Sequence, residues 1–192
     1  MFKKLVSVIF LLGLIHGATG NTPVTYSSNG HEISILGNSN VQRWSAAVPR
    51  VNANADIVVN NGRIEAISRL QVEIDATAIT GSEGNIMTNK IQETLSTRQN
   101  PRIIFRMSRV NGITHNGSEF NVNATGNLII AGVTRPVEIT AQGRVLPNGD
   151  IQISGVEELK MTSWQLEPPR AMLGALRTSD DFTVNFLITL SK

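Results

Sequence analysis

The sequence predicts an all-β fold in which about eight antiparallel strands form a barrel or a sandwich, with one short helix near one end. Three observations support this fold class. Apolar residues recur at every second position in one segment after another, and turn-forming groups such as Asn60-Asn61-Gly62 separate these segments. Only one segment shows the spacing of a helix instead. A chain of 192 residues suits a single domain with its own hydrophobic core.

The strand segments are defined by their alternation, because successive side chains of a strand point to opposite faces. Gln71 and Glu73, for example, lie between apolar neighbours and belong to the other face of their strand. The alternating apolar sets are Ile33 and Ile35; Ile57 and Val59; Leu70, Val72 and Ile74; Ile103, Phe105 and Met107; Leu128 and Ile130; Val137, Ile139 and Val145; Ile151 and Ile153; and Phe182, Val184, Phe186, Ile188 and Leu190.

The segment 126–145 (GNLIIAGVTRPVEITAQGRV) is the most informative pair of strands. Two alternating runs flank a Gly-Val-Thr-Arg-Pro corner, which predicts that Arg135, just before Pro136, lies in the turn. The segment contains no catalytic group. Its function must therefore depend on what its apolar face surrounds.

The helical segment covers residues 83–98, where Met87, Ile91 and Leu95 recur every four residues. Such a helix either plugs one end of the barrel or forms a lid over the mouth of a cavity. A second segment, 168–176 (PPRAMLGAL), reads as a non-strand insertion before the last strand and would also cover an opening.

Residues 1–20 have the pattern of a secretory signal peptide: Lys3 and Lys4, an apolar run at 5–15, and small residues that predict cleavage after Gly20. The apolar run is shorter than the roughly 20 residues of a membrane-spanning helix. The domain is therefore expected at 21–192, in the periplasm or outside the cell. The chain has no cysteine, which excludes both a disulfide and lipid attachment through a cysteine.

Charge and composition exclude two classes of function. Without Lys3 and Lys4 the chain carries fifteen basic and fifteen acidic residues, so nucleic acid binding loses its electrostatic support. Aromatic residues are only 5% of the chain, too few for the two aromatic girdles of a membrane-spanning barrel. A homodimer remains compatible with the sequence.

The sequence contains no recognisable catalytic or metal-binding constellation. His31 and His115 have no second ligand at metal-binding spacing, and neither a nucleophile elbow nor a phosphate-binding loop occurs. The adjacent pairs Glu157-Glu158 and Asp180-Asp181 point to opposite faces if they lie on strands. We expect no cofactor, no metal and no enzymatic activity; the alternative is a hydrolase or isomerase whose residues meet only in space.

Several segments of the chain, in a fixed order, match the pattern of a known family. They are GNSNVQRWSAAV at 37–48, MTNKIQETL at 87–95 before PRIIFRMSRV at 101–110, GNLIIAGVTRPVEIT at 126–140, and PPRAMLGAL at 168–176 before TSDDFTVNFLITL at 178–190. Through these segments the chain resembles the YceI-like family, secreted lipocalin-like β-barrels that bind polyisoprenoid lipids. One departure is that members often carry a histidine and an acid before the first tryptophan, whereas this chain has Gln42 and Arg43 before Trp44.

The resemblance implies an eight-stranded lipocalin-like barrel that holds a long isoprenoid or similar lipid among its inner side chains. A polar head group would then sit at the mouth, near Lys90, Arg98, Arg102 or Arg170. The rival hypothesis is a barrel filled by its own side chains that acts as an interaction or stress-response module. The residues expected to contact the lipid are Leu70, Val72, Ile74, Ile103, Phe105, Met107, Leu128, Ile130, Val137, Ile139, Val184 and Phe186.

Overall fold

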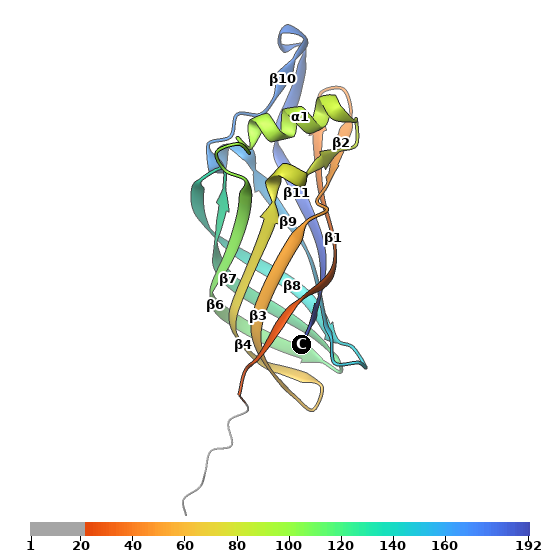
Figure 1. Ribbon diagram of the computed structural model, residues 1–192, viewed down its shortest axis with the longest axis vertical. Helices are drawn as coiled ribbons and strands as arrows, with labels where there is room; N and C mark the ends of the chain where they lie inside the picture. The colour runs from red at the N-terminus through yellow and green to blue at the C-terminus, as the bar shows by residue number, and fades with distance from the viewer. Residues whose placement is uncertain (1–21) are drawn as a thin grey trace, which may run out of the picture.

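The computed structural model describes residues 22–192, which form a closed antiparallel barrel (Figure 1). The predicted signal peptide lies outside the described residues. The eight long strands are β1 (Val24–Ser39), β3 (Val51–Asn60), β4 (Arg63–Asp75), β6 (Arg102–Asn116), β7 (Glu119–Ile130), β8 (Val133–Val145), β9 (Ile151–Lys160) and β11 (Leu176–Ser191). The shorter elements are β2 (Arg43–Ala47), β5 (Thr80–Gly81), β10 (Arg170–Ala171), the helix α1 (Asn85–Thr94), and the 3₁₀ turns η1 (Ala76–Ala78), η2 (Met161–Trp164) and η3 (Met172–Gly174).

The long strands follow one another around the barrel in the order β11, β9, β8, β7, β6, β4, β3, β1. The barrel closes where β1 pairs with β11, from Ser27 opposite Ser191 to Ser39 opposite Thr178. This closure completes the wall, although β1 pairs with β3 only over Val24–Ser27 and β8 pairs with β9 only over Ala141–Val145. The predicted all-β class and its eight strands are confirmed, and the barrel rather than the sandwich is the correct architecture.

Two tight turns show how local sequence sets the register. Asn61 and Gly62 have φ values of 50° and 74° and join β3 to β4, as the Asn-Gly pair predicts. Ala131 and Gly132, at 48° and 80°, make the turn between β7 and β8. The prediction that Arg135 lies in this turn is wrong, because two residues suffice for the turn and β8 begins at Val133.

The barrel is filled with side chains at the end opposite α1. Adjacent strands alternate inward apolar and outward polar residues, so each contributes to one continuous core. The fully buried side chains of this end include Tyr26, Ile57, Ile64, Phe120, Ile151 and Leu190.

Two inner-face glycines make room for the rings inside. Gly143 pairs directly with Phe120, and Gly155 pairs directly with Phe186. A Cβ on either glycine would collide with the ring opposite it. Each phenylalanine therefore lies against bare backbone, which lets large rings fit within a narrow barrel.

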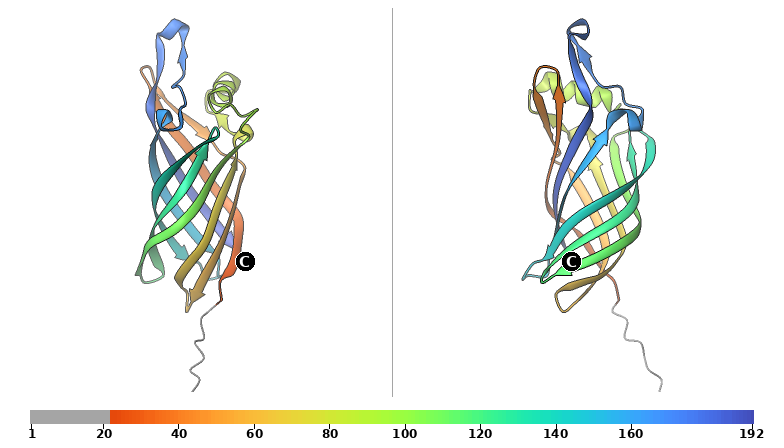
Figure 2. Two further views of the ribbon diagram at one scale, coloured as in Figure 1. Left: turned by 90° about the vertical axis from the view of Figure 1, so that its left-hand side faces the viewer. Right: turned by 180° about the vertical axis from the view of Figure 1, so that it is seen from behind.

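The other end of the barrel carries α1 and the hairpin of β10 and β11, on opposite sides (Figure 2). The helix is shorter than predicted: it begins after Gly84, whose φ is 75°, and ends at Thr94. The segment 168–176 is not free of strand, because Arg170 and Ala171 pair with Arg177 and Leu176. Among residues 22–192, no helix is long and apolar enough to cross a membrane.

Candidate functional site

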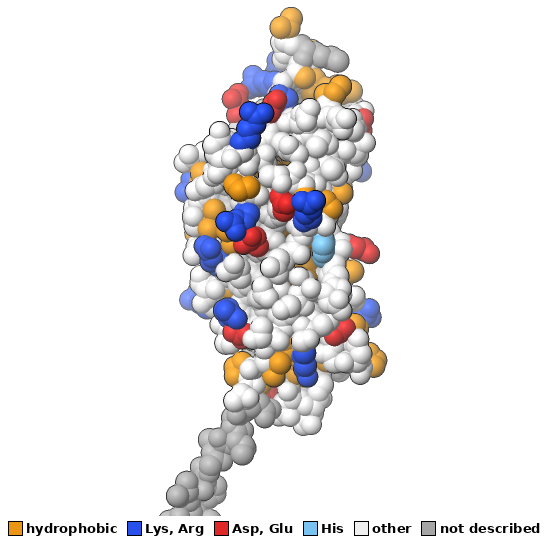
Figure 3. Space-filling view, viewed as in Figure 1, with side chains coloured by type: hydrophobic (Ala, Val, Ile, Leu, Met, Phe, Trp, Pro, Cys, Tyr) orange, Lys and Arg blue, Asp and Glu red, His pale blue; other side chains and the backbone are white. Residues whose placement is uncertain are grey.

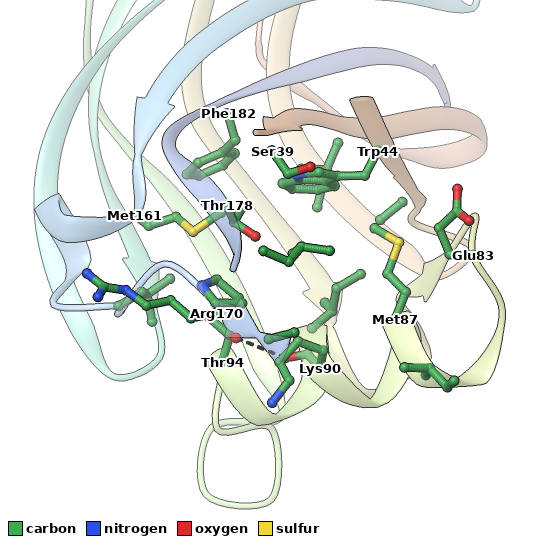
Figure 4. Close-up of a pocket in the computed structure, with 18 of the residues that line it drawn as sticks. Ser39, Trp44, Glu83, Met87, Lys90, Thr94, Met161, Arg170, Thr178 and Phe182 are labelled. Atoms are coloured by element: carbon green, nitrogen blue, oxygen red, sulfur yellow. Dashed lines mark hydrogen bonds between the residues drawn. The ribbon is translucent and has the colours of Figure 1, made fainter. Parts of the chain in front are cut away.

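A cavity of about 480 Å³ lies at the α1 end, between the helix, the β1–β2 hairpin and the β10–β11 hairpin. Figure 4 shows Trp44, Met87, Met161 and Phe182 around this space. Its volume is within the usual range of small-molecule sites. The apolar side chains that line it are Ile35, Trp44, Ala46, Ile86, Met87, Ile91, Leu95, Met161, Leu166, Pro169, Ala171, Leu176 and Phe182.

Two more glycines position the side chains that line the cavity. Trp44 on β2 lies across Gly37 of β1, its direct partner in the strand pair, and its indole N–H donates to the Asn38 carbonyl at 3.3 Å. Met87 lies in the same way across Gly81. Both large side chains can thus lie flat along the wall.

A second apolar cluster forms the opposite wall of the cavity, where η2 packs on the ends of β7 and β8. Ile130, Met161, Trp164 and Leu166 are buried there, and the Trp164 indole N–H donates to the Leu128 carbonyl at 3.1 Å. Arg135 holds the same turn through a hydrogen bond of 2.7 Å from Nε to the Ser163 carbonyl. This wall is therefore fixed by polar contacts outside the cavity.

Asp180 supports the start of η2 from β11. Its carboxylate accepts hydrogen bonds from the backbone N–H and the hydroxyl of Thr162, at 2.8 and 2.7 Å. These bonds hold the pKa of Asp180 below its ordinary value of 3.8. The carboxylate is thus engaged in fixing the turn.

Charged groups of the cavity stand at its edge. Glu83, Lys90 and Arg170 line it, and Figure 4 shows them around the central apolar space. Lys90 Nζ makes an ion pair of 2.6 Å with Glu93. Within the described part of the chain, no buried side-chain nitrogen or oxygen lacks a hydrogen-bond partner. The arrangement can accept an apolar chain inside and a polar group at the rim.

All twelve residues predicted to contact a lipid lie on the inner face of the barrel. The register places Val72, Phe105 and Leu128 in one row across three strands, and Phe105 is buried beside Gly126. Two apolar clusters account for most of these residues. The large core packs against Leu70, Val72, Ile74, Ile103, Met107, Val184 and Phe186. The second cluster contains Ile130 and packs against Ile103, Leu128 and Val137. Ile139 shares the face of Val137 but packs against neither cluster.

None of the twelve is among the residues that line the cavity. Of the expected head-group contacts, Lys90 and Arg170 line it, whereas Arg98 and Arg102 do not. The alternation of long strands identified the inner face but missed Trp44, Ala46 and Phe182 as cavity residues. The helical stripe and the segment 168–176 do contribute lining residues, among them Met87, Ile91 and Leu176.

A second hollow, of about 690 Å³, lies on the outer wall where β1 separates from β3. Its charged side chains form two ion pairs, Arg50 with Asp75 at 3.1 Å and Arg102 with Glu73 at 3.2 Å. His31 also lines it. Figure 3 shows acidic and basic side chains interspersed on this face of the molecule.

The remaining groups considered for catalysis lie apart. His115 Nε2 is 2.8 Å from the Ile64 carbonyl, at the end of the barrel away from the cavity. Among residues 22–192, no three histidine or acidic side chains come together as metal ligands. Glu158 is exposed on the outer side of β9, whereas Glu157 is half-buried and faces inward.

Glu157 is an acidic side chain whose pKa is affected by its position on the inner face of β9. Burial raises its pKa above the ordinary 4.5, although a hydrogen bond from the Thr140 backbone partly offsets this. Between the unfolded pKa and the higher folded pKa, the folded chain binds more protons than the unfolded chain. Stability associated with Glu157 is therefore present below pH 4.5 and is lost as the pH rises through the folded pKa.

We expect Glu157→Gln to be more stable than the wild type at neutral pH, since it removes the cost of burying the charge. The free energies of unfolding in urea should diverge as the pH rises from about 4.5, the ordinary pKa of this carboxyl. Three other carboxyl groups have lowered pKa values, but they are present in both proteins, so their effects on the free energy of unfolding cancel in the difference. They are Asp56, Asp75 and Asp180. A difference that stays constant with pH would contradict the assignment.

Comparison with known proteins identifies relatives of this barrel. The model of the YceI-like domain matches residues 28–190. BcnA of Burkholderia cenocepacia is similar in structure, with 18% identity over 84% of this chain and 96% of that protein, and a TM-score of 0.63. No curated protein matches the chain.

Two further solved structures have the same fold. A polyisoprenoid binding domain from Saccharophagus degradans, implicated in plant cell wall breakdown, covers 87% of this chain and 97% of its own length at 12% identity, with a TM-score of 0.68. The YceI protein of Campylobacter jejuni covers 77% and 84% at 18% identity, with a TM-score of 0.58. At these identities the likeness concerns the fold alone. The family match, which spans most of the chain, shows that this protein belongs to the YceI-like family.

Proposed function

We propose that this protein is an exported, non-enzymatic binding protein that holds a long apolar lipid, a polyisoprenoid, for carriage, storage or sequestration. The observation that carries the proposal is the cavity of about 480 Å³, with apolar walls and with charged groups at its edge. A related barrel is described as a polyisoprenoid binding domain, which supports the same ligand class. The pattern of residues 1–20 supports export to the periplasm or beyond.

The energetics of such a ligand fit the site. Each buried methylene contributes about 0.8 kcal/mol, so burial of about ten carbons provides micromolar affinity before the cost of ordering the chain. Met87, Met161 and Ile91 are flexible or aliphatic, which suits a chain without fixed polar groups. The ligand's polar end would face Lys90 and Arg170 at the rim.

The test is to purify the protein from its exported fraction and to analyse it by native mass spectrometry and organic extraction. We expect a co-purifying lipid, and saturable binding of a fluorescent polyprenyl probe after its removal. A lipid-free mass together with no probe binding would favour the rival, a ligand-free interaction module. Under this rival hypothesis, side chains would fill the whole interior of the barrel, as they fill the end opposite α1.

A further inference from the structure

The mouth of the cavity is surrounded by exposed apolar side chains. The three most exposed large hydrophobic residues of the described chain are Leu173, Ile86 and Val41. Their solvent-accessible areas, relative to the reference value for each residue type, are 111%, 87% and 68%. They come from three separate segments: the tip of the β10–β11 hairpin, the first turn of α1, and the β1–β2 connection. We call Val41, Ile86 and Leu173 the apolar rim.

The apolar rim belongs to the end of the molecule where the cavity opens. Ile86 lines the cavity, Val41 lies between the lining residues Ser39 and Gln42, and Leu173 lies between the lining residues Ala171 and Leu176. The β10–β11 hairpin extends furthest from the barrel (Figure 1), and hydrophobic side chains are visible at that tip (Figure 3). The rim residues are therefore neighbours of the cavity lining in each of the three segments.

Basic groups accompany the rim. Among residues 22–192, Arg43, Arg170 and Arg177 make no ion pair with an acidic side chain. The segments that contribute most of the cavity lining and the rim, 39–46, 81–98 and 161–180, carry five basic and four acidic residues. The basic residues are Arg43, Lys90, Arg98, Arg170 and Arg177, and the acidic ones are Glu83, Glu93, Glu167 and Asp180. The mouth therefore has an excess of one positive charge, which suits anionic lipid head groups.

The shape of the rim distinguishes between occupants. A stable protein interface needs about 20–30 residues a side with close complementarity. Three apolar points on separate segments do not form such a surface for a second copy of this chain. They can, however, each enter a soft lipid surface while the nearby arginines stay among the head groups.

We propose that the mouth of the barrel docks on a lipid bilayer through the apolar rim, with the surrounding arginines on anionic head groups, and that the ligand passes between bilayer and cavity there. This inference rests on the proposed function, because it names the place from which the proposed lipid enters. The docking is peripheral and reversible. Neither the barrel wall nor the filled end takes part.

The test compares wild-type protein with the double variant Val41→Asn/Leu173→Asn. Leu173 has a φ of 56°, a conformation that asparagine tolerates better than leucine, and Val41 lies outside the strands, so both changes fit the local backbone. Neither residue lines the cavity. The matched control is Val156→Asn, an exposed apolar residue on the outer wall of β9.

Cosedimentation with vesicles of phosphatidylethanolamine and phosphatidylglycerol measures the docking. We expect the double variant to bind at least about tenfold more weakly than the wild type, and Val156→Asn to bind like the wild type. Transfer of a fluorescent polyprenol from these vesicles to the protein should also be slower for the double variant than for the wild type. Equilibrium binding of the same polyprenol added from ethanol should be unchanged.

The outcomes separate the two proposals. Weaker vesicle binding by the double variant supports docking. This holds even if neither the wild type nor the variants bind the polyprenol, a result that would contradict the proposed function but not the docking. Docking is overturned if wild type and double variant cosediment equally, or if the wild type does not bind vesicles. It is also overturned if the rim instead holds a dimer, seen by light scattering as a wild-type dimer and a monomeric double variant without vesicle binding.

Discussion

We expect Ala46→Trp to weaken the binding of a polyprenyl probe at least about hundredfold. Ala46 on β2 is buried, with 3% exposure, and its side chain lines the cavity. An indole at this position occupies space that the lipid would fill, and exclusion of about four methylenes at about 0.8 kcal/mol each removes about 3 kcal/mol of binding. Titration of the delipidated protein with the probe measures the effect.

The neighbouring residue provides the control for this experiment. Ala47 lies next to Ala46 on the same strand and is exposed on the opposite face, so Ala47→Trp adds the same side chain outside the cavity. It should bind the probe like the wild type. If Ala46→Trp folds and still binds with wild-type affinity, the cavity at the α1 end is not the lipid site.

We expect Gly143→Ala to lower the free energy of unfolding by about 3 kcal/mol, at the upper end of the cost of overpacking a core. The added methyl group would collide with the ring of Phe120 and stand 2.8 Å from the Gln152 carbonyl oxygen. Phe120 is 2% exposed and belongs to the large apolar core, so a shift of its ring disturbs the side chains packed around it. Urea denaturation of the two proteins provides the measurement.

Gly112→Ala is the matched control for Gly143→Ala, because it adds the same methyl group at a glycine of another strand. A Cβ at Gly112 meets no atom within 4 Å, and the residue does not need a left-handed φ. This variant should be as stable as the wild type or more stable by about 0.5 kcal/mol, through a smaller entropy of the unfolded chain. Equal stabilities for Gly143→Ala and Gly112→Ala would show that the Phe120 ring is not fixed against the wall.

The sequence was sufficient for the strands and their faces because alternation is a local property. Leu70, Val72 and Ile74 needed only their polar neighbours to be assigned to one face, and the Asn61-Gly62 turn set the pairing of β3 with β4. The helical stripe of Met87, Ile91 and Leu95 was likewise local. Each of these features depends on residues within about ten positions of one another.

The position of the cavity could not be predicted, because it depends on contacts between distant segments. Whether an inner position is filled or open is decided by pairs such as Phe120 with Gly143, which meet only through the register of the whole sheet. The cavity itself is built by β2, β10 and α1. Five residues in β2 and two in β10 are too few to show a period.

The filled end of the barrel makes the cavity blind-ended. Tyr26, Phe120 and Leu190 leave no second exit at that end, so a chain held as proposed must enter tail first and leave in the reverse order. Its polar end is then the last part to enter and the first to meet an acceptor. Under the proposed function, the lipid therefore enters and leaves through the same opening, so loading and release would take place at that one end of the barrel.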